Sequence, residues 1–299
     1  MRGEKEQQCL DRIKDATFTK DGALIKHPFT GKTYTEIRDD EFAKEQIWYI
    51  NSNCHNNYFG LLEADRNEFE RILRKAEPNQ KMSIFPDFVF ANGFIEHFQV
   101  TSSSVTRKGS NHAKKESEFK HRVELETKQI ENEWNQVPSF DEVRSKAWVF
   151  TSPTHSHEFL IISFKNNWKH HMDSYRKYNG VKEIGVFMVE YPEFALSMCE
   201  NVYGDWINGM AQGDMREQEQ FKEYRLSRDK KLLEYIYQFR EQIKYVIFVN
   251  QVRYEVIRTE NIPYLLKLMP WDFTIYPLAV TTVSRVKNIS IPANLGQGG

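Results

Sequence analysis

The 299-residue sequence has few cysteines, no long apolar run and almost no excess of charge. Its three cysteines (Cys9, Cys54 and Cys199) are odd in number and widely spaced, which argues against a disulfide framework and fits a reducing compartment. No apolar stretch approaches the length of a membrane span, and the charged start of the chain does not resemble a signal peptide. We therefore expect a cytoplasmic protein with no membrane partner.

A net charge of -1 also removes any global argument for nucleic-acid binding, so a DNA-binding face would have to be local. The sequence lacks the glycine-rich loops that bind nucleotides and the G-x-S-x-G turn of many serine hydrolases. Three clusters contain histidine: Cys54-His55, His155-Ser156-His157 and His170-His171. No C-x-x-C pair or H-E-x-x-H spacing accompanies them, which argues against zinc.

A hydrophobic content of 40% and an aromatic content of 14% support a packed core. Apolar periodicity predicts helices at about 65–76, 112–135, 194–209 and 228–241, and strands at about 146–150, 184–189, 245–250 and 252–258. Residues 159–162 fit either a strand or the start of a helix. We predict one α/β domain over residues 1–299, in which helices flank a mixed central sheet. Its core would span about 65–191, with an N-terminal embellishment and a C-terminal α/β extension at about 192–299.

The most informative stretch is a pair of short apolar runs between Phe85 and Thr101, separated by Asn92-Gly93. Asn-Gly between apolar runs is the strongest short-range signal for a β-hairpin, because both residues tolerate positive φ angles. Three polar side chains lie within these runs: Asp87, Glu96 and Gln99. A buried carboxylate is costly unless it is paired or binds a metal, so the hairpin is the first candidate for a functional site.

The order of Pro86-Asp87, a turn, an acidic residue on the next strand, a helix and a buried strand resembles the core of the PD-(D/E)xK nuclease superfamily, which has the restriction-endonuclease-like fold. The resemblance implies an endonuclease that hydrolyses DNA phosphodiester bonds with Mg²⁺ or Mn²⁺, as type II restriction enzymes do. It also implies that Asp87 and Glu96 are the metal ligands, which suits the preference of Mg²⁺ for carboxylate oxygens. Because restriction-type nucleases often dimerise to cut two strands, a homodimer is a further expectation.

The sequence departs from this family where a lysine is expected two residues after the acid, because Phe98 stands there. With Asn92-Gly93 as a two-residue turn, Asp87 would lie opposite Phe98 and on the same face as Glu96.

A second way to align the sequence with the family motif takes Gln99-Val100-Thr101 as its degenerate form, with Gln99 in place of the acid. This alignment places Gln99 and His97 on the face opposite Glu96, unless a three-residue turn brings that face round to Asp87. Either side chain could position water or a ligand. The candidate catalytic residues are therefore Asp87, Glu96, Gln99 and His97.

Four basic residues cluster after the hairpin: Arg107, Lys108, Lys114 and Lys115. Arg and Lys supply most contacts to nucleic-acid phosphates, so this stretch is the best candidate for DNA binding; a solvated loop with a basic bias is the alternative. A displaced catalytic lysine could come from Lys108, Lys114 or Lys115, and the sequence does not fix which.

Two other segments also fit the resemblance. Glu68 or Glu70, on the helix before the hairpin, could add a carboxylate, as a helix acid does in some restriction enzymes. The spacing His171-x-x-x-Tyr175 resembles the Gln-x-x-x-Tyr helix of RecB-like members.

A second class of function stays open, namely a catalytically inactive protein on the same scaffold that binds nucleic acid or a protein partner. Oxygen ligands that converge with a lysine nearby favour the enzyme. Carboxylates that point apart, or that internal partners satisfy, favour the binding protein. A basic, concave face would indicate DNA, and an apolar patch a protein partner.

Overall fold

The computed structural model describes residues 3–16, 56–80, 84–106, 109–135, 143–151, 154–200, 220–221, 223–268, 273–277 and 282–290. The helices in these ranges are α1 (Glu4–Lys14), α4 (Glu63–Lys75), α5 (Asn111–Asn135), α6 (His157–Lys177), α8 (Lys230–Tyr237) and α9 (Ile262–Leu268), with 3-10 turns η1 (Leu226–Arg228) and η2 (Thr259–Asn261). The strands are β1 (Asn56–Phe59), β2 (Glu77–Pro78), β3 (Phe88–Phe90), β4 (Gly93–Gln99), β5 (Val105–Thr106), β6 (Gly109–Ser110), β7 (Val143–Thr151), β8 (Ile184–Glu190), β9 (Leu196–Glu200), β10 (Gln220–Phe221), β11 (Tyr245–Val249), β12 (Tyr254–Arg258), β13 (Phe273–Pro277) and β14 (Thr282–Ser290).

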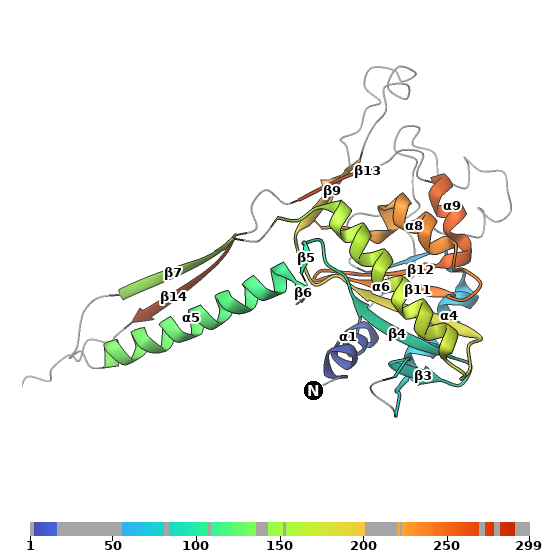
Figure 1. Cartoon of the computed structure of the whole chain (residues 1–299), viewed down its shortest axis with the longest axis horizontal. Coiled ribbons are helices and arrows are strands. Elements are labelled where there is room, and N and C mark those ends of the chain that lie inside the picture. The colour runs from blue at the N-terminus through green and yellow to red at the C-terminus, as the bar shows by residue number, and fades with distance from the viewer. Residues whose placement is uncertain are drawn as a thin grey trace, which may run out of the picture.

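Seven strands form one mixed sheet in the order β1-β12-β11-β8-β4-β3-β2 (Figure 1). Strand β4 is antiparallel to β3 and parallel to β8, and β8 is parallel to β11. The predicted α/β class, with helices flanking a mixed central sheet, is therefore confirmed. Because β1, β11 and β12 belong to this sheet, it extends past both ends of the range 65–191 that we predicted for the core.

Helices cover both faces of the sheet. On one face, Trp168 of α6 contacts Phe187 of β8 with ring centroids 4.7 Å apart. On the other face, Phe69 of α4 packs against Tyr245 of β11 with centroids 5.5 Å apart. Tyr245 pairs with the residue before Phe187, so the two aromatic contacts lie on opposite faces. We call these the α6 face and the α4 face.

Side chains of β4 also alternate between the two faces, which places its polar residues on different sides of the sheet. Glu96 is in register with Phe187 and therefore lies on the α6 face, together with Phe98. His97 and Gln99 lie on the α4 face, as the sequence predicted.

A separate unit of α5, β7 and β14, which we call the arm, extends away from the sheet (Figure 1). Strands β7 and β14 are antiparallel over their whole length. Phe119 and Val123 of α5 form a small core with Trp148 and Phe150 of β7. The predicted helix at 112–135 agrees with α5, and its apolar stripe is buried against β7 rather than against the main sheet.

Three predictions about individual elements need correction or completion. The turn of the hairpin consists of residues 91–92, not Asn92-Gly93, so Phe88 pairs with Ile95 and Asp87 lies opposite Glu96 instead of Phe98. The ambiguous segment 159–162 lies inside α6, whose start is capped by the Ser156 hydroxyl. The helix predicted at 194–209 is wrong in its first part, because pairing with β13 makes 196–200 a strand. Residues 201–209 lie outside the described ranges.

None of the helices in the described part of the chain is both long enough and apolar enough to cross a membrane.

Candidate functional site

The hairpin brings Asp87 and Glu96 together on the α6 face. Asp87 immediately precedes β3, and its backbone N–H donates a hydrogen bond to Glu96 Oε2 over 3.0 Å. The backbone N–H of His97 donates to Asp87 Oδ2 over 2.8 Å. The two acids on adjacent strands therefore form one coupled pair.

Burial makes this pair electrostatically unfavourable when both groups are ionised. Loss of solvation, reinforced by the charge of Glu96, raises the pKa of Asp87 from 3.8 to about 7. Loss of solvation likewise raises the pKa of Glu96 from 4.5 to about 8. Backbone hydrogen bonds favour the ionised forms but do not offset the desolvation. A divalent cation would supply the missing positive charge.

Helix α6 places His171 beside the pair. Its Nδ1 lies 2.5 Å from Glu96 Oε1, and its ring stacks on Phe98 with centroids 4.7 Å apart and an interplanar angle of 16°. Burial lowers the pKa of His171 to about 4, so the ring is neutral at pH 7 and the contact is a hydrogen bond rather than an ion pair. His171 thus touches both the acid and the residue that replaces the expected lysine.

A large cavity is lined by residues that are close in sequence to this site. It has a volume of about 840 Å³ and lies between strands β2 and β3 and the C-terminal part of α6. Its lining includes Phe85 and Val89, on either side of Asp87 in the sequence, and Ser174, one turn after His171. Asp87, Glu96 and His171 are not themselves among the residues that line this cavity.

His97 and Gln99 serve a different cluster on the α4 face. His97 Nε2 lies 3.0 Å and Gln99 Nε2 lies 2.8 Å from the same oxygen of Glu190, at the end of β8. Arg12 of α1 contacts the other oxygen over 2.8 Å. Burial acts to raise the pKa of Glu190, but these hydrogen bonds outweigh it and hold the pKa at about 2. The side chains of His97 and Gln99 therefore do not join Asp87 and Glu96.

The helix acid predicted near the hairpin also has other partners. Glu68 lies 2.5 Å from Lys244 Nζ and accepts a hydrogen bond from the Tyr245 hydroxyl over 2.6 Å. It belongs to α4, as does Glu70, and that helix covers the face opposite Asp87.

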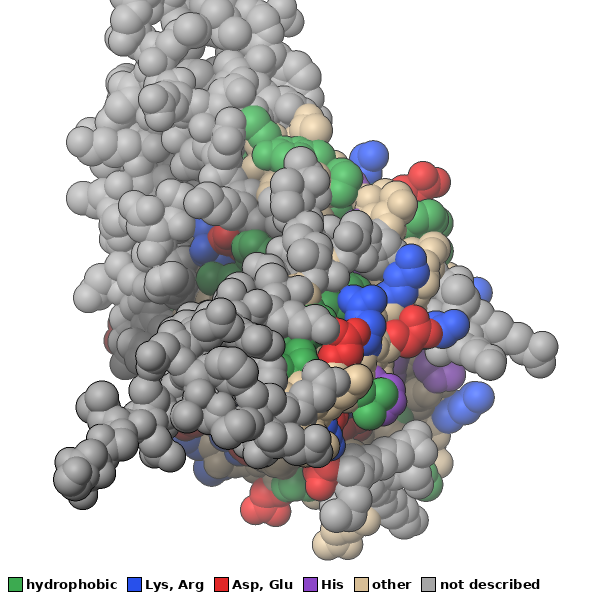
Figure 2. All heavy atoms as spheres, turned by 90° about the vertical axis from the view of Figure 1, so that its left-hand side faces the viewer, with side chains coloured by type: hydrophobic (Ala, Val, Ile, Leu, Met, Phe, Trp, Pro, Cys, Tyr) green, Lys and Arg blue, Asp and Glu red, His purple; other side chains and the backbone are tan. Residues whose placement is uncertain are grey.

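The structure describes two of the four basic residues that we predicted to bind DNA. Arg107 and Lys108 lie outside the described residues. Lys114 and Lys115 are exposed on the first turns of α5, and Lys114 pairs with Glu118 over 3.8 Å. Figure 2 shows Lys and Arg side chains intermingled with Asp and Glu on the face that it presents.

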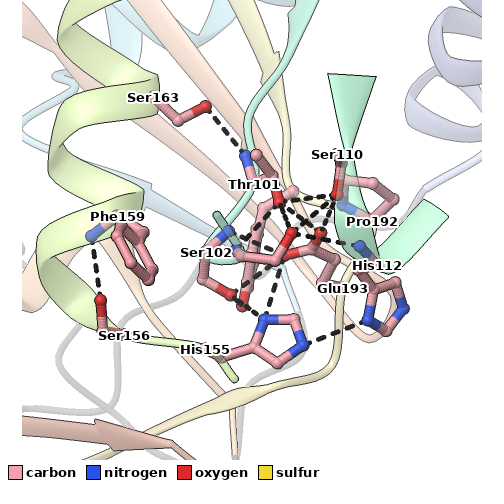
Figure 3. Close-up of polar contacts among 12 residues, drawn as sticks. Thr101, Ser102, Ser110, His112, His155, Ser156, Phe159, Ser163, Pro192 and Glu193 are labelled. Carbon is pink, nitrogen blue, oxygen red and sulfur yellow. Dashed lines mark hydrogen bonds and ion pairs between the residues drawn. The ribbon is translucent and has the colours of Figure 1, made fainter. Parts of the chain in front are cut away.

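A second buried cluster lies where the arm meets the sheet (Figure 3). It combines His112 of α5, His155 just before α6 and Glu193 just after β8. His155 Nε2 lies 3.1 Å from His112 Nδ1, and His155 Nδ1 lies 2.8 Å from Ser102 Oγ. Despite burial, hydrogen bonds from His155, Thr101 and the Ser102 N–H hold the pKa of Glu193 at about 2.

Sequence reasoning missed Glu190, Glu193 and the pairing of His112 with His155. Two acids at the carboxyl end of a strand predicted to be buried, as in 184–193, are a signal that could have identified the first two. No local spacing connects His112 with His155, because 43 positions separate them.

No protein-family model, curated protein or solved structure matches this chain.

Proposed function

We propose that this protein is a Mg²⁺- or Mn²⁺-dependent endonuclease of the restriction-endonuclease-like class, acting on DNA, with Asp87 and Glu96 as metal ligands. The observation that carries the proposal is the buried pair of carboxyl groups on adjacent strands. Among the described residues, no lysine or arginine makes a hydrogen bond or ion pair with either of them.

The order of elements supports the proposed class. Helix α4 precedes the antiparallel strands β2, β3 and β4, and helix α6 then leads to β8, which lies parallel beside β4. This order contains the hairpin, helix and buried strand on which the resemblance rests, with β5, β6, α5 and β7 between β4 and α6. The acid before β3 and the acid within β4 lie side by side, as paired metal ligands require.

The residues present fit a hard divalent cation. Mg²⁺ takes one or two carboxylates together with water and phosphate oxygens, and two carboxyl groups with raised pKa values gain most from such an ion. When bound, the ion would stabilise charge on the phosphate and lower the pKa of a bound water. The His97 N–H fixes the orientation of Asp87, and His171 fixes that of Glu96.

His171 is the best candidate for the role that a lysine has in the family. Its neutral ring stacks on Phe98, the side chain at the lysine position, and its Nδ1 contacts Glu96. A neutral imidazole here could orient water by hydrogen bonding, without the charge of a lysine.

The second candidate function is a non-catalytic protein on this scaffold that binds nucleic acid or a protein partner. Two observations favour it: Phe98 replaces the lysine, and the oxygens of Glu96 already have internal partners, namely the Asp87 N–H and His171.

A nuclease assay separates the two functions. Tag-free protein is incubated with supercoiled and linear DNA in Mg²⁺, Mn²⁺ or EDTA. We expect metal-dependent cleavage that Asp87→Asn and Glu96→Gln abolish and that His171→Ala slows about 10- to 100-fold. The matched control His170→Ala changes the neighbouring residue of α6 and should retain full activity. Absence of cleavage by the wild type with every metal would favour the binding protein, and cleavage unaffected by Asp87→Asn would refute the site.

A further inference from the structure

The cluster at the base of the arm has no role in the proposed nuclease and lies at a different end of the sheet. Its three members come from distant parts of the chain: His112 is the second residue of α5, His155 precedes α6 and Glu193 follows β8. One donor atom from each lies within 4.8 Å of the others. His155 and Glu193 are both only 4% exposed, so burying these polar side chains together costs desolvation free energy.

The two imidazole rings face each other through nitrogen atoms. The distance from His112 Nδ1 to His155 Nε2 is 3.1 Å. Two nitrogens that ligate one zinc ion at about 2.0–2.1 Å in tetrahedral geometry lie about 3.3 Å apart. The observed separation therefore needs an adjustment of only a few tenths of an ångström to admit a shared ion.

The partners of His155 are those of a metal ligand. Its Nδ1 faces the Ser102 hydroxyl at 2.8 Å and Glu193 Oε2 at 3.5 Å, both of which can accept its proton. With Nδ1 protonated, Nε2 carries the lone pair and points at His112. Metal-binding histidines usually donate their second ring N–H to an oxygen in this way, which fixes the tautomer and the ring orientation.

Glu193 is held in place as rigidly as the histidines. The Ser102 N–H donates to its Oε2 over 2.7 Å and the Ser110 hydroxyl donates to its Oε1 over 3.1 Å. A cavity of about 320 Å³ borders both His112 and Glu193, so one side of the cluster faces open space.

We propose that His112, His155 and Glu193 bind a divalent transition-metal ion, with Zn²⁺ as the ion that suits them best. Two imidazoles and a carboxylate are typical zinc ligands, whereas Mg²⁺ prefers oxygen ligands alone. The side facing the cavity leaves a coordination position for water or another small oxygen ligand. The ion would tie the start of α5 to the segments before α6 and after β8, and so fix the arm to the sheet.

A second trio, Cys9, His97 and Glu190, also places its donor atoms within 4.8 Å. There Arg12 already pairs with Glu190 over 2.8 Å, so the carboxylate has its counter-charge and an added cation would meet repulsion. Among the residues that the structure describes, no arginine or lysine makes a hydrogen bond or ion pair with His112, His155 or Glu193.

The test is a titration of tag-free, metal-free full-length protein with ZnCl₂ by calorimetry and with CoCl₂ by visible absorption. It is carried out on an Asp87→Asn/Glu96→Gln background, so that the hairpin acids contribute nothing. We expect one equivalent to bind, with a cobalt spectrum of low-coordinate geometry and no thiolate charge transfer, and a rise in Tm on addition of Zn²⁺. His112→Ala should weaken binding more than tenfold, whereas His121→Ala, at an exposed position of the same helix, and Cys9→Ser should not.

Absence of stoichiometric binding in the background protein would overturn the proposal, whatever the behaviour of the variants. Binding that His112→Ala leaves unchanged, in a variant whose circular dichroism matches the parent, would also overturn it. Neither result bears on the proposed nuclease activity, which rests on different residues at a different end of the sheet.

Discussion

At the scale of single residues, the acids of the hairpin have opposite properties from those at the end of β8. Asp87 and Glu96 have raised pKa values, because burial is not offset by a cation. Glu190 and Glu193 have lowered pKa values, because hydrogen bonds outweigh burial. The second pair therefore contributes to stability as carboxylates, whereas the first pair is retained at a cost, which is typical of functional groups.

This difference predicts an unusual effect of neutralising the hairpin acids. An acid with a raised pKa binds more protons in the folded chain, so its contribution to stability is fully present below the unfolded pKa, near 4, and is lost as the pH rises to about 8. Asn and Gln side chains do not titrate in this range, so Asp87→Asn and Glu96→Gln each remove the loss of stability that ionisation of the replaced acid causes. We expect each variant to be more stable than the wild type at pH 8 without metal, by about 1 kcal/mol or about 2–4 °C in Tm.

The measurement is thermal unfolding in EDTA at several pH values between 5 and 8.5. The difference in Tm between each variant and the wild type should become smaller as the pH is lowered towards 5. Glu158→Gln, at an exposed position of α6, serves as the control and should show no pH-dependent difference. Variants that are less stable than the wild type at pH 8 would show that the acids are structural.

At the scale of elements, the hairpin depends on a close approach at its turn. Gly93 begins β4 in register with Ile184 of β8, and a Cβ atom at Gly93 would lie 2.0 Å from the Ile184 carbonyl oxygen. Both are backbone positions in a buried sheet and cannot separate without loss of strand pairing. The glycine is therefore required for the approach of two strands and not for a positive φ angle, which Gly93 does not have.

Gly93→Ala should accordingly destabilise the fold by about 1–3 kcal/mol, measured by urea unfolding. Gly180→Ala is the matched control, because the atoms nearest to its added Cβ belong to the movable Tyr178 side chain. Equal stability of the two variants would contradict the proposed register of β4 on β8.

Much of the element pattern could be predicted from the sequence. The apolar runs of β8, β11 and β12 and the stripe of Phe119 and Val123 on α5 gave the right kind of element at nearly the right place. Local sequence patterns gave wrong predictions where pairing with a distant strand determines the structure. Asn92-Gly93 marked the hairpin but not its register, which the contact of Gly93 with Ile184 sets, and 196–200 became a strand because β13 pairs with it.

The candidate site was predictable only in part for the same reason. Asp87 and Glu96 are close in sequence and stood out as charges within apolar runs. His171 lies 75 positions from Glu96, and His155 lies 43 positions from His112, so only the folded chain brings these residues together.

At the scale of the whole molecule, the two clusters lie at different places in the same sheet. The hairpin acids lie between β3, β4 and α6, whereas the histidine cluster lies at the base of the arm and borders a cavity. The arrangement predicts two independent cation sites of different chemistry, one with carboxylate ligands alone and one with two imidazoles and a carboxylate. A homodimer stays a prediction that sedimentation of the full chain can check.

The most direct test of the central claim is a titration with Mn²⁺ at pH 8, followed by electron paramagnetic resonance of the free ion. We expect the wild type to bind Mn²⁺, His112→Ala to bind it equally well, and Asp87→Asn and Glu96→Gln each to lose it. Binding should also raise the Tm of the wild type, because the ion neutralises the acid pair. Mn²⁺ binding of equal strength in the wild type and in Asp87→Asn, or no binding at all, would contradict the claim that the hairpin acids form a metal centre.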